Sequence, residues 1–97
     1  MEPIVSKIHS FLIKRRKTVA VAESCTGGLT SSLLTQISGS SQYFIEGVIA
    51  YSNKAKEVIL KIPHYMIEKN GAVSKPIASL MAQRIRKIAK TDFGIGI

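Results

Sequence analysis

The sequence predicts an α/β protein of three layers, in which helices cover both faces of a mainly parallel sheet. The alternation of two kinds of segment supports this fold class. Segments with helical spacing of apolar residues alternate along the chain with short β-branched segments, and such alternation favours parallel strands joined by right-handed crossovers. The 97 residues have room for one small core. We therefore expect a single domain.

The first half of the chain is expected to contain two helices and two strands. Pro3 suits a first helical turn, and the apolar residues that follow at helical spacing reach Arg16. Residues 18–23 are small or β-branched, which is typical of a buried strand. A second helix should run from near the glycine pair 27–28 to Gly39. Residues 43–51 should form a second strand, with Gly47 as a bulge or a point of close approach.

The second half is expected to contain two longer helices, a helical turn and a third strand. Ser52 or Asn53 should cap the third helix, and residues 64–69 should form the turn. Ser74 should cap the last helix, whose expected buried residues are Ile77, Leu80, Met81, Ile85 and Ile88. The third strand begins at residue 93 and includes the final residue of the sequence. We therefore expect the chain to be the N-terminal part of a larger domain.

The net charge of +8 raises the question of an anionic partner. The only compact basic run is residues 14–17, and a solvated basic surface explains most of the charge. A basic surface also suits a small substrate that carries phosphate. Nucleic-acid binding has little support, because the sequence has no recognised nucleic-acid motif and no row of aromatic residues among the basic ones.

The single cysteine and the distribution of charges indicate the cellular compartment in which the protein is found. Cys25 cannot form an internal disulfide, and no Cys/His cluster has metal-ligand spacing, so we expect a reducing cytoplasm and no metal. Charged residues interrupt every apolar run, so no membrane association is expected. Cys25 could be a nucleophile at a helix N-terminus, but no histidine lies nearby in sequence to activate it.

Two polar segments follow the first two predicted strands. In parallel sheets the loops after the strands lie on one edge, where ligands usually bind. In the first segment, Ser24, Thr26, Gly27 and Gly28 offer hydroxyls and backbone N–H groups that could hold a phosphate or a developing oxyanion. The alternative is a helix cap followed by a tight turn.

The second polar segment contains Tyr51, Ser52 and Lys56. These residues could supply a phenol, a hydroxyl and an ammonium, and a partly desolvated lysine beside a serine can act as its general base. The alternative is an aromatic residue at a strand end, a helix cap and a solvated lysine.

Four separate motifs, at residues 22–28, 39–41, 51–56 and 71–74, resemble in order and spacing those of the CinA C-terminal domain family. The resemblance implies hydrolysis of the carboxamide of nicotinamide mononucleotide to nicotinic acid mononucleotide and ammonia, without a cofactor. It also implies that Ser24, Ser41, Tyr51 and Lys56 belong to the active-site region, where a serine and a lysine act together.

The choice of nucleophilic serine depends on the sheet. Ser24 is favoured because it shares an edge with Lys56, whereas a strand over residues 43–51 would place Ser41 about 30 Å from Tyr51. Ser41 could take part if the strand is shorter, runs the other way, or if a neighbouring subunit brings it in. We expect a homo-oligomer.

The sequence departs from the family after the third strand. Family members continue into a Thr/Ser-Gly-Ile-Ala-Gly-Pro turn and a second half that carries further binding residues. We therefore expect this chain by itself to be inactive. Two other hypotheses remain open, namely a non-enzymatic remnant with a basic surface and a weak nucleic-acid binder.

Overall fold

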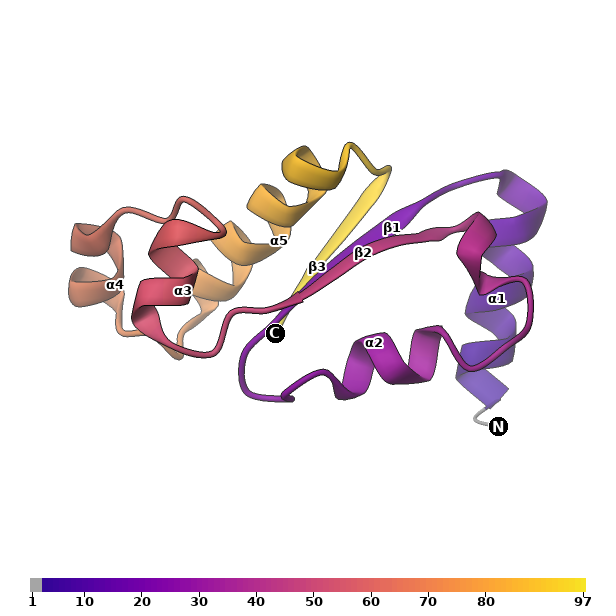
Figure 1. Cartoon of the computed structure of the whole chain (residues 1–97), viewed down its shortest axis with the longest axis horizontal. Coiled ribbons are helices and arrows are strands. Elements are labelled where there is room, and N and C mark those ends of the chain that lie inside the picture. Colours follow the sequence, from indigo (N-terminus) through magenta and orange to yellow (C-terminus); the bar gives the residue numbers. More distant parts are fainter. Residues whose placement is uncertain (1–2) are drawn as a thin grey trace.

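A computed structural model describes residues 3–97 and has helices on both faces of a three-stranded sheet (Figure 1). The elements, in chain order, are α1 (Pro3–Arg15), β1 (Val19–Glu23), α2 (Leu29–Leu34), the short 3-10 helix η1 (Ser40–Gln42), β2 (Phe44–Ile49), α3 (Asn53–Val58), α4 (His64–Asn70), α5 (Lys75–Ala89) and β3 (Phe93–Gly96). The predicted α/β fold class is confirmed. None of the helices between residues 3 and 97 combines the length and apolar character needed to cross a bilayer.

The sheet has the order β2-β1-β3, and both pairings are parallel. Strand β1 is therefore central, and all five of its residues are buried. Val19 pairs with Phe44 and Ala20 pairs with Glu46, so Ile45 is the extra residue of a bulge. Gly47 is a point of close approach instead, because a Cβ atom there would lie 2.8 Å from the Ser31 hydroxyl oxygen.

Each face of the sheet has its own apolar core. Because side chains alternate along a strand, Val19 and Val21 of β1 pack with Leu12, Leu34 and Tyr43 on the face that α1 and α2 cover. The small side chains of β1, Ala20 and Ala22, belong to the second core. Figure 1 shows α5, α3 and α4 on the side of the sheet away from α1 and α2. That second core contains Ala20, Ala22, Ala50, Leu60, Ile62, Ile67, Ile77, Met81 and Ile85.

Helix α5 lies directly against β3 because two glycines of the strand leave room for it. A Cβ atom on Gly94 would lie 2.2 Å from the carbonyl oxygen of Ala82, and one on Gly96 would lie 2.2 Å from that of Ala78. Residues two apart in a strand span about 6.6 Å, and residues four apart in a helix span about 6 Å. The two glycines therefore match two successive turns of α5.

Several predicted boundaries and buried positions were wrong. Helix α2 ends at Leu34 rather than near Gly39, because the Thr35 hydroxyl donates to the Ser31 and Ser32 carbonyls at the helix end. Strand β2 is shorter than residues 43–51. On α5, Leu80 is only partly buried and Ile88 is 44% exposed, because they lie at the margin of the helix face that packs on the sheet.

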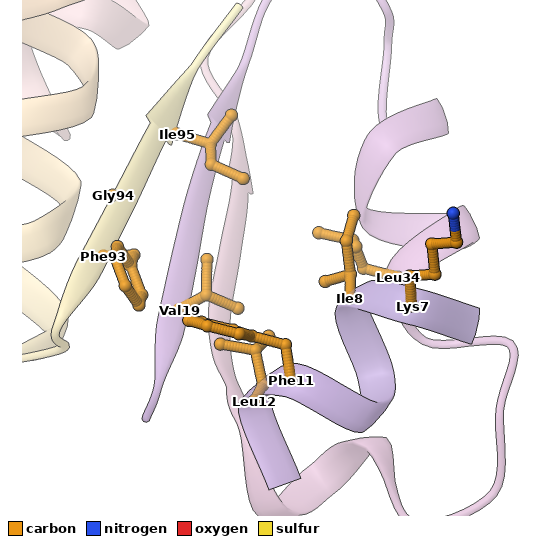
Figure 2. A pocket seen from close by; sticks show the side chains of 9 residues that line it. All are labelled: Lys7, Ile8, Phe11, Leu12, Val19, Leu34, Phe93, Gly94 and Ile95. Carbon is orange, nitrogen blue, oxygen red and sulfur yellow. The ribbon is translucent and has the colours of Figure 1, made fainter. Parts of the chain in front are cut away.

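An apolar hollow of about 410 Å³ lies between α1 and the β1–β3 side of the sheet. Figure 2 shows side chains of α1 and Leu34 of α2 facing Val19 and Ile95 across it. The full lining is Lys7, Ile8, Phe11, Leu12, Val19, Leu34, Phe93, Gly94 and Ile95. Phe11 and Phe93 remain 47% and 44% exposed at this hollow, and β3 is an edge strand. An exposed apolar patch beside an open strand edge favours association.

We expect the 97-residue chain to self-associate through this hollow. Sedimentation velocity over a concentration series should show a rising sedimentation coefficient, and Phe11→Lys should reduce it because the ring is half exposed and lies at the hollow. Ile59→Lys, which is also exposed but on the α3 side, is the control and should leave association unchanged. A chain that stays monomeric at every concentration would contradict this prediction.

Candidate active site

The carboxyl ends of β1 and β2 lie on one edge of the sheet, as the sequence predicts. The Ala50 N–H donates to the Glu23 carbonyl at 2.8 Å, and the Ser24 N–H donates to the Ile97 carbonyl at 2.6 Å. The backbone on both sides of the Glu23–Ser24 peptide is therefore fixed by the neighbouring chain segments. Ser24 and Tyr51, which follow the two strands, come to the same edge.

Lys56 lies in α3, which follows β2, and its side chain reaches Ser24 in the loop after β1. The Ser52 hydroxyl accepts a hydrogen bond from the Ala55 N–H at 3.0 Å and so begins the helix. One turn later the Lys56 side chain is only 1% exposed. Its Nζ donates to the Ser24 hydroxyl and to the Tyr51 carbonyl, each at 3.0 Å.

The Lys56 amine is held by neutral oxygens. Among residues 3–97, no carboxylate lies within ion-pair distance of it. Ser24 is also buried, at 7% exposure. A lysine in a desolvated setting beside a hydroxyl can remove the hydroxyl proton and so create a nucleophile.

A cleft of about 390 Å³ opens onto this pair. Its lining comes from the loop after β1, the loop after β2 with α3, and the segment before α5, and comprises Ser24, Cys25, Tyr51, Asn53, Lys56, Ala72 and Val73. Tyr51 is 73% exposed at the cleft, so its phenol is available to a ligand while its carbonyl holds Lys56. Cys25 is an exposed free thiol there.

Glu23 is a buried residue of this region that was not singled out from the sequence. Its carboxylate is fully buried and accepts hydrogen bonds from the Thr26 hydroxyl at 2.6 Å, from the Thr30 and Ser31 N–H groups at 2.8 Å, and from the Ser31 hydroxyl. Burial raises the pKa of Glu23, but these hydrogen bonds outweigh burial and lower the pKa to about 2. The signal in the sequence was one carboxylate at the end of an otherwise apolar strand.

The predicted substrate-binding residues already have partners within the chain. The Thr26 hydroxyl donates to Glu23, the Gly27 N–H donates to the Ser24 carbonyl at 3.2 Å, and the Ser52 hydroxyl caps α3. Gly28 has a φ of 108° as the residue before α2, a conformation that glycine adopts without strain. The capping and turn roles considered as the alternative are therefore present, and a role in substrate binding stays a prediction.

Ser41 does not share this edge within one chain. It is an exposed residue of η1, which precedes β2, whereas Tyr51 follows β2. The structure therefore brings together Ser24, Tyr51 and Lys56, and places Ser41 beyond the opposite end of the strand. A contribution of Ser41 from a neighbouring subunit stays a prediction.

Within the part of the chain that the structure describes, no group of three or more His, Cys, Asp or Glu side chains could hold a metal ion. The fold and the site thus define a class of protein, an α/β domain with a buried serine–lysine pair at the carboxyl edge of its parallel sheet.

The comparisons with known proteins identify the family. The model of the CinA C-terminal domain matches residues 1–97, so the chain belongs to the CinA C-terminal domain family. A CinA-like protein of Koribacter versatilis is 48% identical over 96 residues, which are 99% of this chain and 23% of the relative. A CinA-like protein of Syntrophus aciditrophicus is 45% identical over 94 residues, 97% of this chain and 22% of the relative.

Solved structures agree with this assignment. A crystal structure of a competence-damaged protein (CinA) superfamily protein from Escherichia coli superposes with a TM-score of 0.90 at 30% identity, covering 94% of this chain and 53% of that one. The competence/damage inducible protein CihA from Agrobacterium tumefaciens gives a TM-score of 0.88 at 32% identity, with 92% and 54% covered. The chain spans about half the length of these structures and under a quarter of the curated relatives.

Proposed function

We propose that this site belongs to a nicotinamide-nucleotide amidase, which hydrolyses the carboxamide of nicotinamide mononucleotide to nicotinic acid mononucleotide and ammonia. The observation that carries the proposal is the 3.0 Å contact between the Lys56 amine and the Ser24 hydroxyl, both buried at the floor of a cleft. The family resemblance supplies the substrate.

In the first half of the reaction, the Lys56 amine takes the Ser24 hydroxyl proton while the Ser24 oxygen attacks the carboxamide carbon. The tetrahedral intermediate collapses, and the proton on Lys56 passes to the departing nitrogen, which leaves as ammonia. The product is an ester on Ser24. In the second half, Lys56 takes a proton from water, the hydroxide attacks the ester, and the Ser24 oxygen leaves with that proton.

The loop after β1 and the start of α5 supply groups for the charged parts of the substrate. Among residues 3–97, the N–H groups of Cys25, Thr26 and Gly28 have no hydrogen-bond partner, so they are the donors that remain for an oxyanion. Lys75 lines an adjoining hollow of about 340 Å³ together with Ser24 and is our candidate for the phosphate. The basic run at residues 14–17 precedes β1 and so lies at the other end of the sheet.

Ammonia release from nicotinamide mononucleotide tests the proposal. We would assay this chain and a domain completed with the remaining residues of a family member, because the chain spans about half of its solved relatives. Free nicotinamide is the matched control substrate, since it has the carboxamide but no phosphate. Turnover of the nucleotide by the completed domain, with an acyl-enzyme mass on Ser24, supports the proposal. A completed domain that folds but releases no ammonia would refute it.

A further inference from the structure

We infer that Glu23 is a positioning residue, whose carboxylate fastens residues 24–31 to the end of β1 and thereby holds Ser24 in reach of Lys56. The inference rests on the proposed function, in which Ser24 is the nucleophile and Lys56 is its base. Glu23 itself does not touch Lys56 or Ser24 through its side chain. It acts through the loop that carries the reactive hydroxyl.

The alternation of side chains along β1 sets up this arrangement. Val19, Val21 and Glu23 face the α1–α2 side, whereas Ala20 and Ala22 face the α5 side. Ser24 continues that second series and meets Lys56 of α3. Glu23 and Ser24 therefore point to opposite faces of the sheet. The Glu23 side chain is hydrogen-bonded to the start of α2, and the Ser24 side chain is hydrogen-bonded to Lys56.

The hydrogen bonds of Glu23 join the end of β1 to residues 26–31 and so close a short loop. Thr26 lies three residues after Glu23, and Thr30 and Ser31 lie seven and eight residues after it. Oε1 holds the turn and the Thr30 N–H, while Oε2 holds Ser31 through its N–H and its hydroxyl. The glycine pair between these anchors has positive φ values of 62° and 108°. The Glu23 carboxylate therefore holds the chain on both sides of Gly27 and Gly28.

Only an ionised carboxylate fits these donors. All four contacts are donors that point at the two oxygens, and a carboxylate accepts at both oxygens without donating. An amide would point its N–H₂ group at one backbone N–H, of Thr30 or of Ser31, and lose that bond, whereas the hydroxyl beside it could turn and accept. Because the pKa of Glu23 is about 2, the fastening persists across the neutral range.

The chain offers a matched control at the other end of the same strand. Asp92 accepts from the Thr18 N–H at 2.9 Å and from the Thr18 hydroxyl at 3.2 Å, so it also fastens β1 through a carboxylate. It lies far along the sheet from Ser24, before β3. Asp92 is exposed, so Asp92→Asn controls for the loss of a carboxylate contact at the far end of β1 and not for the loss of a buried one.

The test compares Glu23→Gln, Asp92→Asn and the pair Thr26→Val and Thr26→Ser in the 97-residue chain. The first readout is amide hydrogen exchange by NMR. In Glu23→Gln we expect residues 25–31 to exchange at least about tenfold faster while the β1 amides keep their protection. Thr26→Val, which removes one hydroxyl from an exposed turn, should show a smaller increase, and Thr26→Ser should restore the wild-type rate. Asp92→Asn should leave these amides unchanged.

The second readout is made in the domain completed with the remaining residues of a family member, and it is the rate at which a fluorophosphonate probe labels Ser24, followed by mass spectrometry. Glu23→Gln should label at least about tenfold more slowly, and Asp92→Asn at the wild-type rate. Unchanged exchange in residues 25–31, or unchanged labelling despite faster exchange, overturns the inference.

If wild-type Ser24 is not labelled, the proposed function fails. The positioning role is then decided by the exchange data and by whether a crystal structure of Glu23→Gln keeps the 3.0 Å contact of Ser24 with Lys56.

Discussion

Replacing Lys56 with methionine in a completed domain should reduce ammonia release from nicotinamide mononucleotide by roughly three orders of magnitude or more. Methionine fills most of the buried space of Lys56 but offers no amine to take the Ser24 proton. Ser24→Ala should cause a similar loss, because a serine and its base act as a unit. The double variant should therefore be no worse than either single one.

Two further variants make this prediction selective. Lys54 is an exposed lysine on the same helix, so Lys54→Ala should change turnover little. Ser41→Ala distinguishes the two nucleophile assignments. If it abolishes turnover while Ser24→Ala mainly raises KM, the assignment of Ser24 is wrong.

Replacing Gly96 with alanine should destabilise the chain by about 3 kcal/mol or more. The new methyl group would lie 2.2 Å from the Ala78 carbonyl oxygen and 2.7 Å from the Ala82 nitrogen, and both are backbone atoms that no side-chain rotation can move. A loss of this size is a large part of the stability of a small domain. Urea denaturation followed by circular dichroism should show the lowered midpoint.

The control for this variant is Gly71→Ala. Gly71 has open space around its Cβ position but a φ of 84°, so alanine there meets backbone strain and no clash. Because its ψ is 144°, a conformation that is essentially restricted to glycine, the cost should be about 1 to 3 kcal/mol and should come from backbone strain alone. Equal midpoints for Gly96→Ala and the wild type would mean that α5 does not pack on β3 as closely as described.

Sequence reasoning predicted that the loops after β1 and β2 meet at one edge of the sheet, because this depends only on the order of strands and on where polar residues follow them. Ser24, Tyr51 and Lys56 were found in this way. Glu23 was missed because three of its donors come from a helix start, and backbone N–H groups leave no mark in the sequence. The early end of α2 was missed for a similar reason, since the Thr35 hydroxyl acts on nearby carbonyls.

The apolar hollow beside α1 was foreseen only in outline. The sequence predicts a third strand that begins at residue 93 and includes Ile95 and Ile97. Ile95 does line the hollow, but four of its nine lining residues, Lys7, Ile8, Phe11 and Leu12, lie on α1. The spacing of apolar residues on α1 predicts an amphipathic helix, and it does not tell how closely that helix approaches the sheet.

The hydrogen bond between Lys56 and Ser24 joins positions 32 residues apart, and this has a consequence for folding. Such a contact closes a long loop, so it can form only after β1 and β2 have paired. A slip of one residue in that pairing would turn Ser24 toward the opposite layer and leave the lysine without its hydroxyl. A newly made or partly unfolded chain therefore lacks the contact between Ser24 and Lys56, which appears only with the correctly registered sheet.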